Sequence, residues 1–191
     1  VTPTDAPEAI ITAPESNGIF YSDQLIAFEG ILSDSEDSAE DLIGYWTSSL
    51  DGELSEVTVE PNSEGEVTGY GLLTEGQHAI ELHVEDSTGK AGLDSIIIEV
   101  GPPNSAPLCE ILTPVTGSAG PEGELVTFTA TASDVDVPAD SLNVSWSSDK
   151  DGALGSSTPN SSGGVSFPYD SLSVNPHVIS MVVSDEIGAT C

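Results

Sequence analysis

Hydrophobic and polar residues alternate over short stretches of this chain. The clearest case is Ile80-Glu81-Leu82-His83-Val84, and residues 179–183 repeat the pattern with Ile, Met and Val at alternate positions. A period of two places the apolar side chains on one face of a β-strand. Further strands are expected at residues 25–28, 42–46, 125–128 and 142–146, separated by turn-forming pairs such as Asp51-Gly52 and Asp151-Gly152. No stretch has helical periodicity, so the sequence predicts an all-β protein.

The chain contains an internal repeat. Residues 28–34 match residues 128–134, and Trp46 to Leu54 matches Trp146 to Leu154, in both cases 100 positions apart. Further along the spacing falls to 99, as a single-residue deletion between two homologous domains would produce. Short strands around one central Trp, in a unit of roughly 100 residues, are typical of immunoglobulin-like sandwiches. We therefore expect two tandem immunoglobulin-like β-sandwich domains, end to end, with each Trp in a core.

The expected boundaries follow from the repeat. Residues 1–101 form repeat 1, residues 102–107 a Pro-rich linker that Pro102-Pro103 should stiffen, and residues 108–191 repeat 2. Repeat 1 continues into an apolar stretch at residues 95–100, which we interpret as its last strand. Repeat 2 stops at the equivalent of Gly92 and apparently lacks that strand. Either the strand lies beyond residue 191, or another subunit donates it.

The charge of the chain limits its partners. Two lysines face 33 acidic residues, which gives a formal net charge of −31 over 191 residues. Such a field repels nucleic acid and attracts divalent cations. The longest aliphatic run, Ile96-Ile97-Ile98, is far shorter than the roughly 20 residues of a membrane helix, so membrane insertion is not expected. Residues 1–5 lack the basic and apolar regions of a signal peptide, as expected of a mature polypeptide.

Several motifs together carry a family resemblance. They are Ser33-Asp34 with Glu36, Leu42 to Trp46, Asp51-Gly52 with Leu54, and Val84 with Asp86 and Gly89, and the second half repeats most of them. This pattern resembles the PKD-like and related immunoglobulin-like repeats of bacterial and archaeal surface proteins. The resemblance implies an extracellular or cell-surface location and a structural role, as a stiff element of a surface layer, filament or adhesin stalk. Its partners would be copies of itself or other repeats of a longer chain.

A second function remains open, namely a glycan- or ligand-binding accessory module of a secreted enzyme or adhesin. A glycan platform needs exposed aromatic rings, and the cores should take both Trp residues. The remaining candidates are Phe20, Tyr21, Tyr70 and Tyr169.

In the fold that the resemblance implies, the loops after the second and sixth strands meet at one end of each domain. Carboxylates gathered there suit Ca²⁺, which takes six to eight oxygen ligands. The candidate ligands at this end are Asp34, Glu36 and Asp86 in repeat 1 and Asp134, Asp136, Asp140 and Asp185 in repeat 2, and Asp51 is a further candidate in a turn at the opposite end of repeat 1, which should face repeat 2. The alternative is that these residues only form turns, which Asp favours without any ion.

Cys109 falls near the start of the first strand of repeat 2, and Cys191 falls where its last strand would begin. These strands run side by side in immunoglobulin-like sandwiches, so a disulfide and an oxidising compartment are expected. Two free thiols are the alternative. Asn143 and Asn160 open glycosylation sequons.

An enzyme is not expected. The chain has no Gly-x-Ser-x-Gly motif, no Cys–His arrangement and no Arg for anion binding. Two repeats of about 100 residues also leave no long insertion that could build a cleft. His78 and His177 occupy equivalent positions, which favours a structural role over metal ligation, and His83 is expected to point outward between two glutamates.

Overall fold

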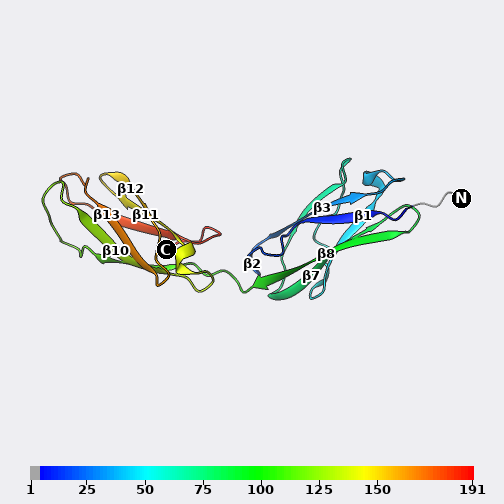
Figure 1. The fold of residues 1–191 in the computed structure, drawn as a ribbon, viewed down its shortest axis with the longest axis horizontal. Coiled ribbons are helices and arrows are strands. Elements are labelled where there is room, and N and C mark those ends of the chain that lie inside the picture. The colour runs from blue at the N-terminus through cyan, green and yellow to red at the C-terminus, as the bar shows by residue number, and fades with distance from the viewer. Residues whose placement is uncertain (1–4) are drawn as a thin grey trace. The chain divides into compact units, whose positions relative to one another are not determined.

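The computed structural model describes residues 5–191, which divide into two compact units. Unit 1 ends at Asn104 and unit 2 comprises Ser105–Cys191, so the division falls within the Pro-rich segment. Each unit is a two-layered β structure with one short 3-10 helix (Figure 1). Within the described residues, no helix has the length and apolar character needed to cross a membrane.

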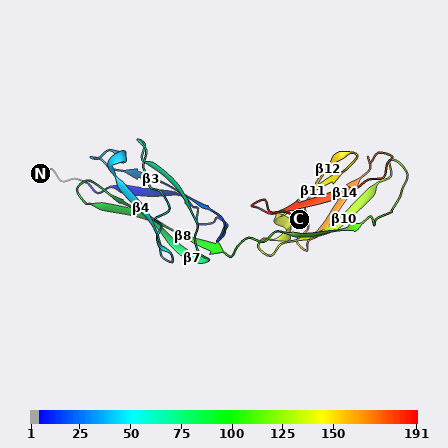
Figure 2. The same ribbon diagram turned by 180° about the vertical axis from the view of Figure 1, so that it is seen from behind.

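Unit 1 is built from two sheets, seen from both sides in Figures 1 and 2. The smaller sheet has the order β1–β3–β6 and the larger has the order β2–β8–β7–β4–β5. The strands are β1 (Glu8–Ala13), β2 (Phe20–Tyr21), β3 (Ile26–Ser33), β4 (Ile43–Ser48), β5 (Gly52–Glu53), β6 (Glu66–Gly71), β7 (Gly76–Glu85) and β8 (Ala91–Gly101), and the 3-10 helix η1 (Ala39–Asp41) precedes β4. Neighbouring strands run antiparallel except β2 and β8, which are parallel.

The core of unit 1 draws residues from both sheets, which therefore pack face to face. Phe28 of β3 is fully buried, and its ring meets that of Trp46 of β4 edge-on with centroids 5.4 Å apart. Ile80, Leu82 and Val84 of β7 are also fully buried, as their alternation predicted. Trp46 is 1% exposed, and truncating such a side chain to Ala typically costs about 3–5 kcal/mol.

Unit 2 repeats this plan with fewer strands. Its sheets have the orders β13–β10–β9 and β12–β11–β14. The strands are β9 (Leu108–Thr113), β10 (Val126–Ser133), β11 (Asn143–Ser148), β12 (Gly152–Ser157), β13 (Gly164–Tyr169) and β14 (Ile179–Ser184), with the 3-10 helix η2 (Ala139–Ser141) before β11. Among the described residues, no strand corresponds to β8 of unit 1.

The core of unit 2 is organised around Trp146, which is 1% exposed. Its ring stacks on Phe167 with centroids 5.6 Å apart, and its Nε1 donates a hydrogen bond of 2.9 Å to Ser157 Oγ. The turns after β4 and β11 lead into Gly52 and Gly152, the first residues of β5 and β12, whose φ angles of 78° and 74° lie in the left-handed region that glycine adopts without strain. These are the turns that the two Asp-Gly pairs predicted.

Candidate functional site

Three segments meet at one end of unit 1, where sequence reasoning placed most of the calcium ligands. Asp34, just after β3, accepts hydrogen bonds at Oδ1 from the N–H groups of Glu36 (2.7 Å) and Asp37 (2.8 Å). Glu36 Oε2 in turn accepts the N–H of Asp5 at 3.1 Å. The carboxylate of Asp37 accepts the N–H and the hydroxyl of Ser87, at 2.8 and 3.1 Å. These bonds tie the segment before β1 to the loops that follow β3 and β7.

Asp86 lies beside this cluster and is 5% exposed. Its Oδ1 accepts hydrogen bonds from Thr88 N–H (2.7 Å), the Thr88 hydroxyl (2.8 Å) and Lys90 N–H (2.9 Å). Burial raises the pKa of the Asp86 carboxyl. Hydrogen bonds from the N–H of Lys90 and from the N–H and hydroxyl of Thr88 lower it by more, so the net pKa lies below its usual value. Asp86 is therefore a carboxylate at neutral pH, and it holds the turn after β7.

Unit 2 has the same arrangement. Asp134 Oδ1 accepts the N–H of Asp136 at 2.7 Å, and Asp136 Oδ2 accepts the N–H of Ser105 at 2.6 Å. Asp185 is 4% exposed, and its Oδ1 accepts the N–H groups of Ile187 and Ala189 at 3.1 and 2.7 Å. The two units thus use their acidic loops in the same way, first of all as acceptors for turn N–H groups.

In each unit, one carboxylate oxygen of these loops takes no part in the hydrogen bonds of the turn. The second oxygen, Oδ2, of Asp34 and of Asp134 is buried, and it has no hydrogen-bond partner among the described residues. A buried carboxylate oxygen without a partner is costly, so water or a cation would stabilise it. However, within residues 5–191 no three His, Cys, Asp or Glu side chains gather closely enough to hold a metal ion. Calcium binding by this set stays a prediction.

Asp51 lies away from the Asp34 cluster. Asp51 follows β4, whereas the acidic loop of Asp34 precedes that strand, so the two lie at opposite ends of it. Asp51 is instead a hydrogen-bond acceptor for both the N–H and the hydroxyl of Thr74. Asp140 lies in η2 and is exposed, and Glu36 is also exposed.

A Ser–His–Asp cluster forms at the end of β4. His78 is fully buried, and its Nε2 donates to the carbonyl oxygen of Thr74 at 2.7 Å. The other ring nitrogen, Nδ1, forms a hydrogen bond with the Ser48 hydroxyl, also at 2.7 Å. Ser48 Oγ then accepts the N–H groups of Leu50 and Asp51, both at 3.1 Å. Every polar atom of the Ser48–His78 pair therefore has a partner.

The cluster recurs in unit 2. His177 Nε2 donates to Ser173 O at 2.7 Å, and Nδ1 lies 2.8 Å from Ser148 Oγ. Asp51 Oδ2 lies 3.8 Å from Nδ1 of His78, and Asp151 Oδ2 lies 3.7 Å from Nδ1 of His177. The structural role predicted for both histidines is consistent with this geometry.

The acids of the cluster are held ionised. Burial raises the pKa of Asp51, but the hydroxyl and N–H of Thr74, with His78 nearby, lower it to a net value below the usual one. Hydrogen bonds from the N–H and hydroxyl of Ser173 likewise lower the pKa of Asp151.

The same cluster is not arranged as a catalytic triad. In a triad the acid binds the ring nitrogen opposite the serine, which orients the imidazole as a base. Here the serine and the acid both face Nδ1, and a backbone carbonyl occupies Nε2. Ser48 is 4% exposed and already accepts two N–H groups, so its oxygen has no access to a substrate.

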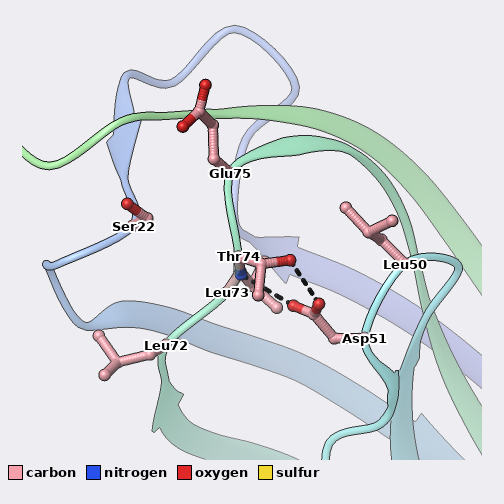
Figure 3. Close-up of a pocket in the computed structure, with 7 residues that line it drawn as sticks. All are labelled: Ser22, Leu50, Asp51, Leu72, Leu73, Thr74 and Glu75. Carbon is pink, nitrogen blue, oxygen red and sulfur yellow. Dashed lines mark hydrogen bonds between the residues drawn. The ribbon is translucent and has the colours of Figure 1, made fainter.

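A shallow cavity of about 780 Å³ opens next to this cluster. Figure 3 shows its lining, in which Leu50, Leu72 and Leu73 surround the Asp51–Thr74 hydrogen bonds, while Ser22 and Glu75 lie at its edge. The carboxylate of Asp51 in this cavity already accepts two hydrogen bonds from Thr74. The cavity therefore offers few free polar groups to a ligand.

The aromatic residues considered for glycan binding are mostly inside. Tyr21 is 4% exposed, and Phe20 and Tyr169 are partly buried against the two cores, which leaves Tyr70 at 57% exposed. Sequence reasoning missed Tyr45, which is 42% exposed and stacks on His83 with ring centroids 4.6 Å apart. The signal was present, because both residues occupy the outward positions of their strands.

Cys109 of β9 and Cys191 are joined by a disulfide, with Cα atoms 6.0 Å apart. Cys191 also exchanges two backbone hydrogen bonds with Val183 of β14, at 3.1 and 3.2 Å. Asn143 and Asn160 are both exposed, and Asn160 Oδ1 accepts the N–H groups of Ser162 and Gly164. Glycosylation of either residue stays a prediction.

The sequence matches no family model and no curated protein. Among solved structures, the fibronectin(III)-like modules of CbhA from Clostridium thermocellum match with a TM-score of 0.62 at 16% identity, covering 95% of this chain and 88% of that one. A chimeric titin Z1Z2 matches with a TM-score of 0.47 at 13% identity over 99% of this chain and 96% of that one, which is too distant to bear on the fold. The chain is therefore an all-β protein with the immunoglobulin- and fibronectin III-like sandwich fold.

Proposed function

We propose that this chain is a non-enzymatic structural element of an extracellular or cell-surface protein, with a PKD-like repeat as its unit. The observation that carries the proposal is the repeated Ser–His–Asp cluster. In both units its polar atoms bind one another and the backbone. Such a cluster stabilises a turn and leaves no reactive group exposed. Duplication of a self-contained unit is how stalks, layers and filaments gain length.

The charge and the disulfide support the same proposal. A net charge of −31 keeps a protein soluble in saline surroundings, where ions screen its self-repulsion. Disulfides persist in oxidising compartments outside the cytosol. Ca²⁺ is part of this proposal as a counter-ion for the loops of Asp34 and Asp134, and the support for it is the buried Oδ2 atom in each.

Electron microscopy of the purified chain over a range of protein concentrations, with calcium and with chelator, tests this function. Filaments or sheets would assign the chain to an assembling layer, and separate molecules at every concentration would assign it to a stalk. Hydrolytic activity on polysaccharide or peptide substrates would contradict a non-enzymatic role, and its loss in Ser48→Ala or Ser148→Ala would assign it to the Ser–His–Asp clusters.

The glycan-binding alternative keeps Tyr70 as its exposed ring from the original set. Glycan capture that is lost in Tyr70→Ala but retained in Tyr45→Ala would favour that alternative. Equal capture by both variants and the parent chain would exclude a platform at Tyr70.

A further inference from the structure

The outward face of the larger sheet of unit 1 carries exposed apolar side chains. The strands β4, β7 and β8 lie side by side in this sheet (Figure 2), and alternate residues of each point away from the core. Four of these outward residues are large and well exposed, namely Ile43 (65%), Tyr45 (42%), Leu93 (56%) and Ile97 (59%). Exposed apolar residues gathered on one face of a soluble protein mark an interaction site.

Carboxylates alternate with the apolar residues along this face. The register of β7 with β8 places the outward side chains in successive rows, each two residues further along the strands. Glu85, Glu81 and Glu99 lie in the first, third and fifth rows. Leu93 and Ile97 lie in the second and fourth rows. Two residues along a strand span about 6.8 Å, so acidic and apolar rows follow one another at about this spacing.

Tyr45 and His83 form the aromatic part of the face. The register places them opposite each other, and their rings stack with an interplanar angle of 2°. His83 Nε2 lies 3.0 Å from Glu81 Oε2 and 3.2 Å from Thr47 Oγ1, which fixes the imidazole ring. Among the described residues no strand pairs with Tyr45 on its other side, because β5 pairs only with Thr47 and Ser48. The second face of the Tyr45 ring is therefore left for a cation, which aromatic rings attract.

Unit 2 shows that the fold does not require such a face. The outward positions of β11 and β14 that correspond to those of β4 and β7 carry hydroxyl or amide groups, apart from one valine. They are Asn143, Ser145, Ser147, Ser180, Val182 and Ser184. Where unit 1 has Ile43 and Tyr45, unit 2 thus has Asn143 and Ser145. The apolar and acidic residues of unit 1 are therefore not explained by folding, which favours a role in binding.

The charge of the face determines the kind of partner. Glu53 of β5 pairs with Thr47 and lies on the same face as the glutamates of β7 and β8. The outward residues of β4, β5, β7 and β8, all in the described part of the chain, include no Lys or Arg. A second copy would bring the same acids against this face, and the 191 residues contain two lysines and no arginine. Because like charges across an interface are unfavourable, the positive side chains come from a different protein.

We propose that this face is the docking surface for an extended segment of a basic partner protein. On the contact side of that segment arginine and aliphatic residues alternate. The arginines reach the glutamates of the odd rows, and the aliphatic side chains cover Leu93 and Ile97. An extended segment repeats its contact side every second residue, which is also the spacing of the rows. Arginine suits the site because its planar guanidinium pairs with carboxylates and stacks on rings such as that of Tyr45. This inference does not depend on the proposed structural role.

A synthetic peptide with the sequence Arg-Ser-Leu-Ser-Arg-Ser-Leu-Ser-Arg tests the chemistry of the surface. It is added to the full chain, and binding is followed by NMR. We expect saturable binding, with the largest chemical-shift changes in β4, β7 and β8. A control peptide with serine in place of both leucines keeps the charge and should bind at least fivefold more weakly. A second control with the same composition but all arginines at one end should also bind at least fivefold more weakly, because it loses the alternation.

Variants of the chain test the surface itself. Leu93→Ser combined with Ile97→Ser changes two exposed positions, so the fold should be kept while peptide binding weakens at least fivefold. Glu81→Gln should weaken binding and make it less sensitive to salt, because one charge contact is lost. The matched control is Val182→Ser, which changes an outward residue of unit 2 that is 44% exposed and should leave binding unchanged.

The proposal is overturned if the peptide does not bind, if the serine control peptide binds equally well, or if the double variant binds like the parent chain. A dimer by light scattering that is lost in the double variant would show that a second copy occupies the face, which also overturns it. Saturable shifts of the same residues with cellohexaose, but not with the peptide, would assign the face to a glycan instead.

Discussion

Reducing the disulfide should destabilise unit 2 and leave unit 1 unchanged. The bond joins residues that are 82 positions apart, so it closes a loop that contains nearly all of unit 2. In the chain-entropy model, closing a loop of this length lowers the free energy of the folded state relative to the unfolded state by about 4.5 kcal/mol. Single domains have total stabilities of about 5–15 kcal/mol, so a large share of the stability of unit 2 is at stake.

Urea denaturation followed by tryptophan fluorescence measures this loss, because Trp46 reports on unit 1 and Trp146 on unit 2. With a denaturant slope of about 1–3 kcal/mol per molar, the midpoint of the unit 2 transition should fall by roughly 1.5–4.5 M. A Trp46→Phe variant assigns the transitions. The Cys109→Ala and Cys191→Ala double variant should behave like the reduced chain.

Unit 1 provides the internal control, because both cysteines lie in unit 2. Its midpoint should be the same in oxidised and reduced chains. A shift of the unit 2 transition equivalent to less than about 1 kcal/mol would refute the reasoning from loop closure, and so would an equal shift of both transitions.

Four further predictions concern the polar clusters and the charge. Ser48→Ala should cost about 1–3 kcal/mol in urea denaturation, since it leaves Nδ1 of His78 and the N–H groups of Leu50 and Asp51 without the hydroxyl, whereas Ser48→Thr should recover part of the loss. The folded pKa of Asp51 lies below its unfolded value of about 3.8, so its contribution is present above that pH and is lost as pH falls below it; Asp51→Asn should flatten this acid limb. Calcium should raise the melting temperature more in the parent chain than in Asp34→Asn, and equal melting in calcium and chelator would exclude the ion. Raising salt from 0.1 to 1 M shortens the screening length from about 10 to about 3 Å, so it should raise the melting temperature of this chain of charge −31, and a fall would contradict the role given to self-repulsion.

The repeat is the reason that the cores could be predicted from sequence. An apolar residue at one position has many explanations, but Trp46 and Trp146 occur at the same place in two homologous units, and both are 1% exposed. The alternation in residues 80–84 likewise identified the buried face of β7. The period of two and the internal repeat can be found in the sequence alone, without knowing which residues are in contact in the fold.

The polar partners could not be predicted in the same way, because they depend on which turns meet in space. Asp51 as a calcium ligand stays a prediction, but the sequence did not indicate that Thr74 lies within hydrogen-bonding distance of its carboxylate. Tyr21 was counted as an available aromatic ring, and β2 buries it beside β8. No role was predicted for Ser48, although serine recurs at the equivalent position 148. In each case the deciding contact joins residues distant in sequence.

The disulfide also determines how unit 2 would respond to mechanical load. Tension applied across Cys109 and Cys191 passes directly through the bond, since it joins the first strand of the unit to its last described residue. The 81 residues between them, about 280 Å of extended chain, carry no tension while the bond is intact. Unit 1 contains no cysteine and therefore no such disulfide, so it would unfold and lengthen under load while unit 2 keeps its length. Redox state would then set the length to which the chain can be stretched.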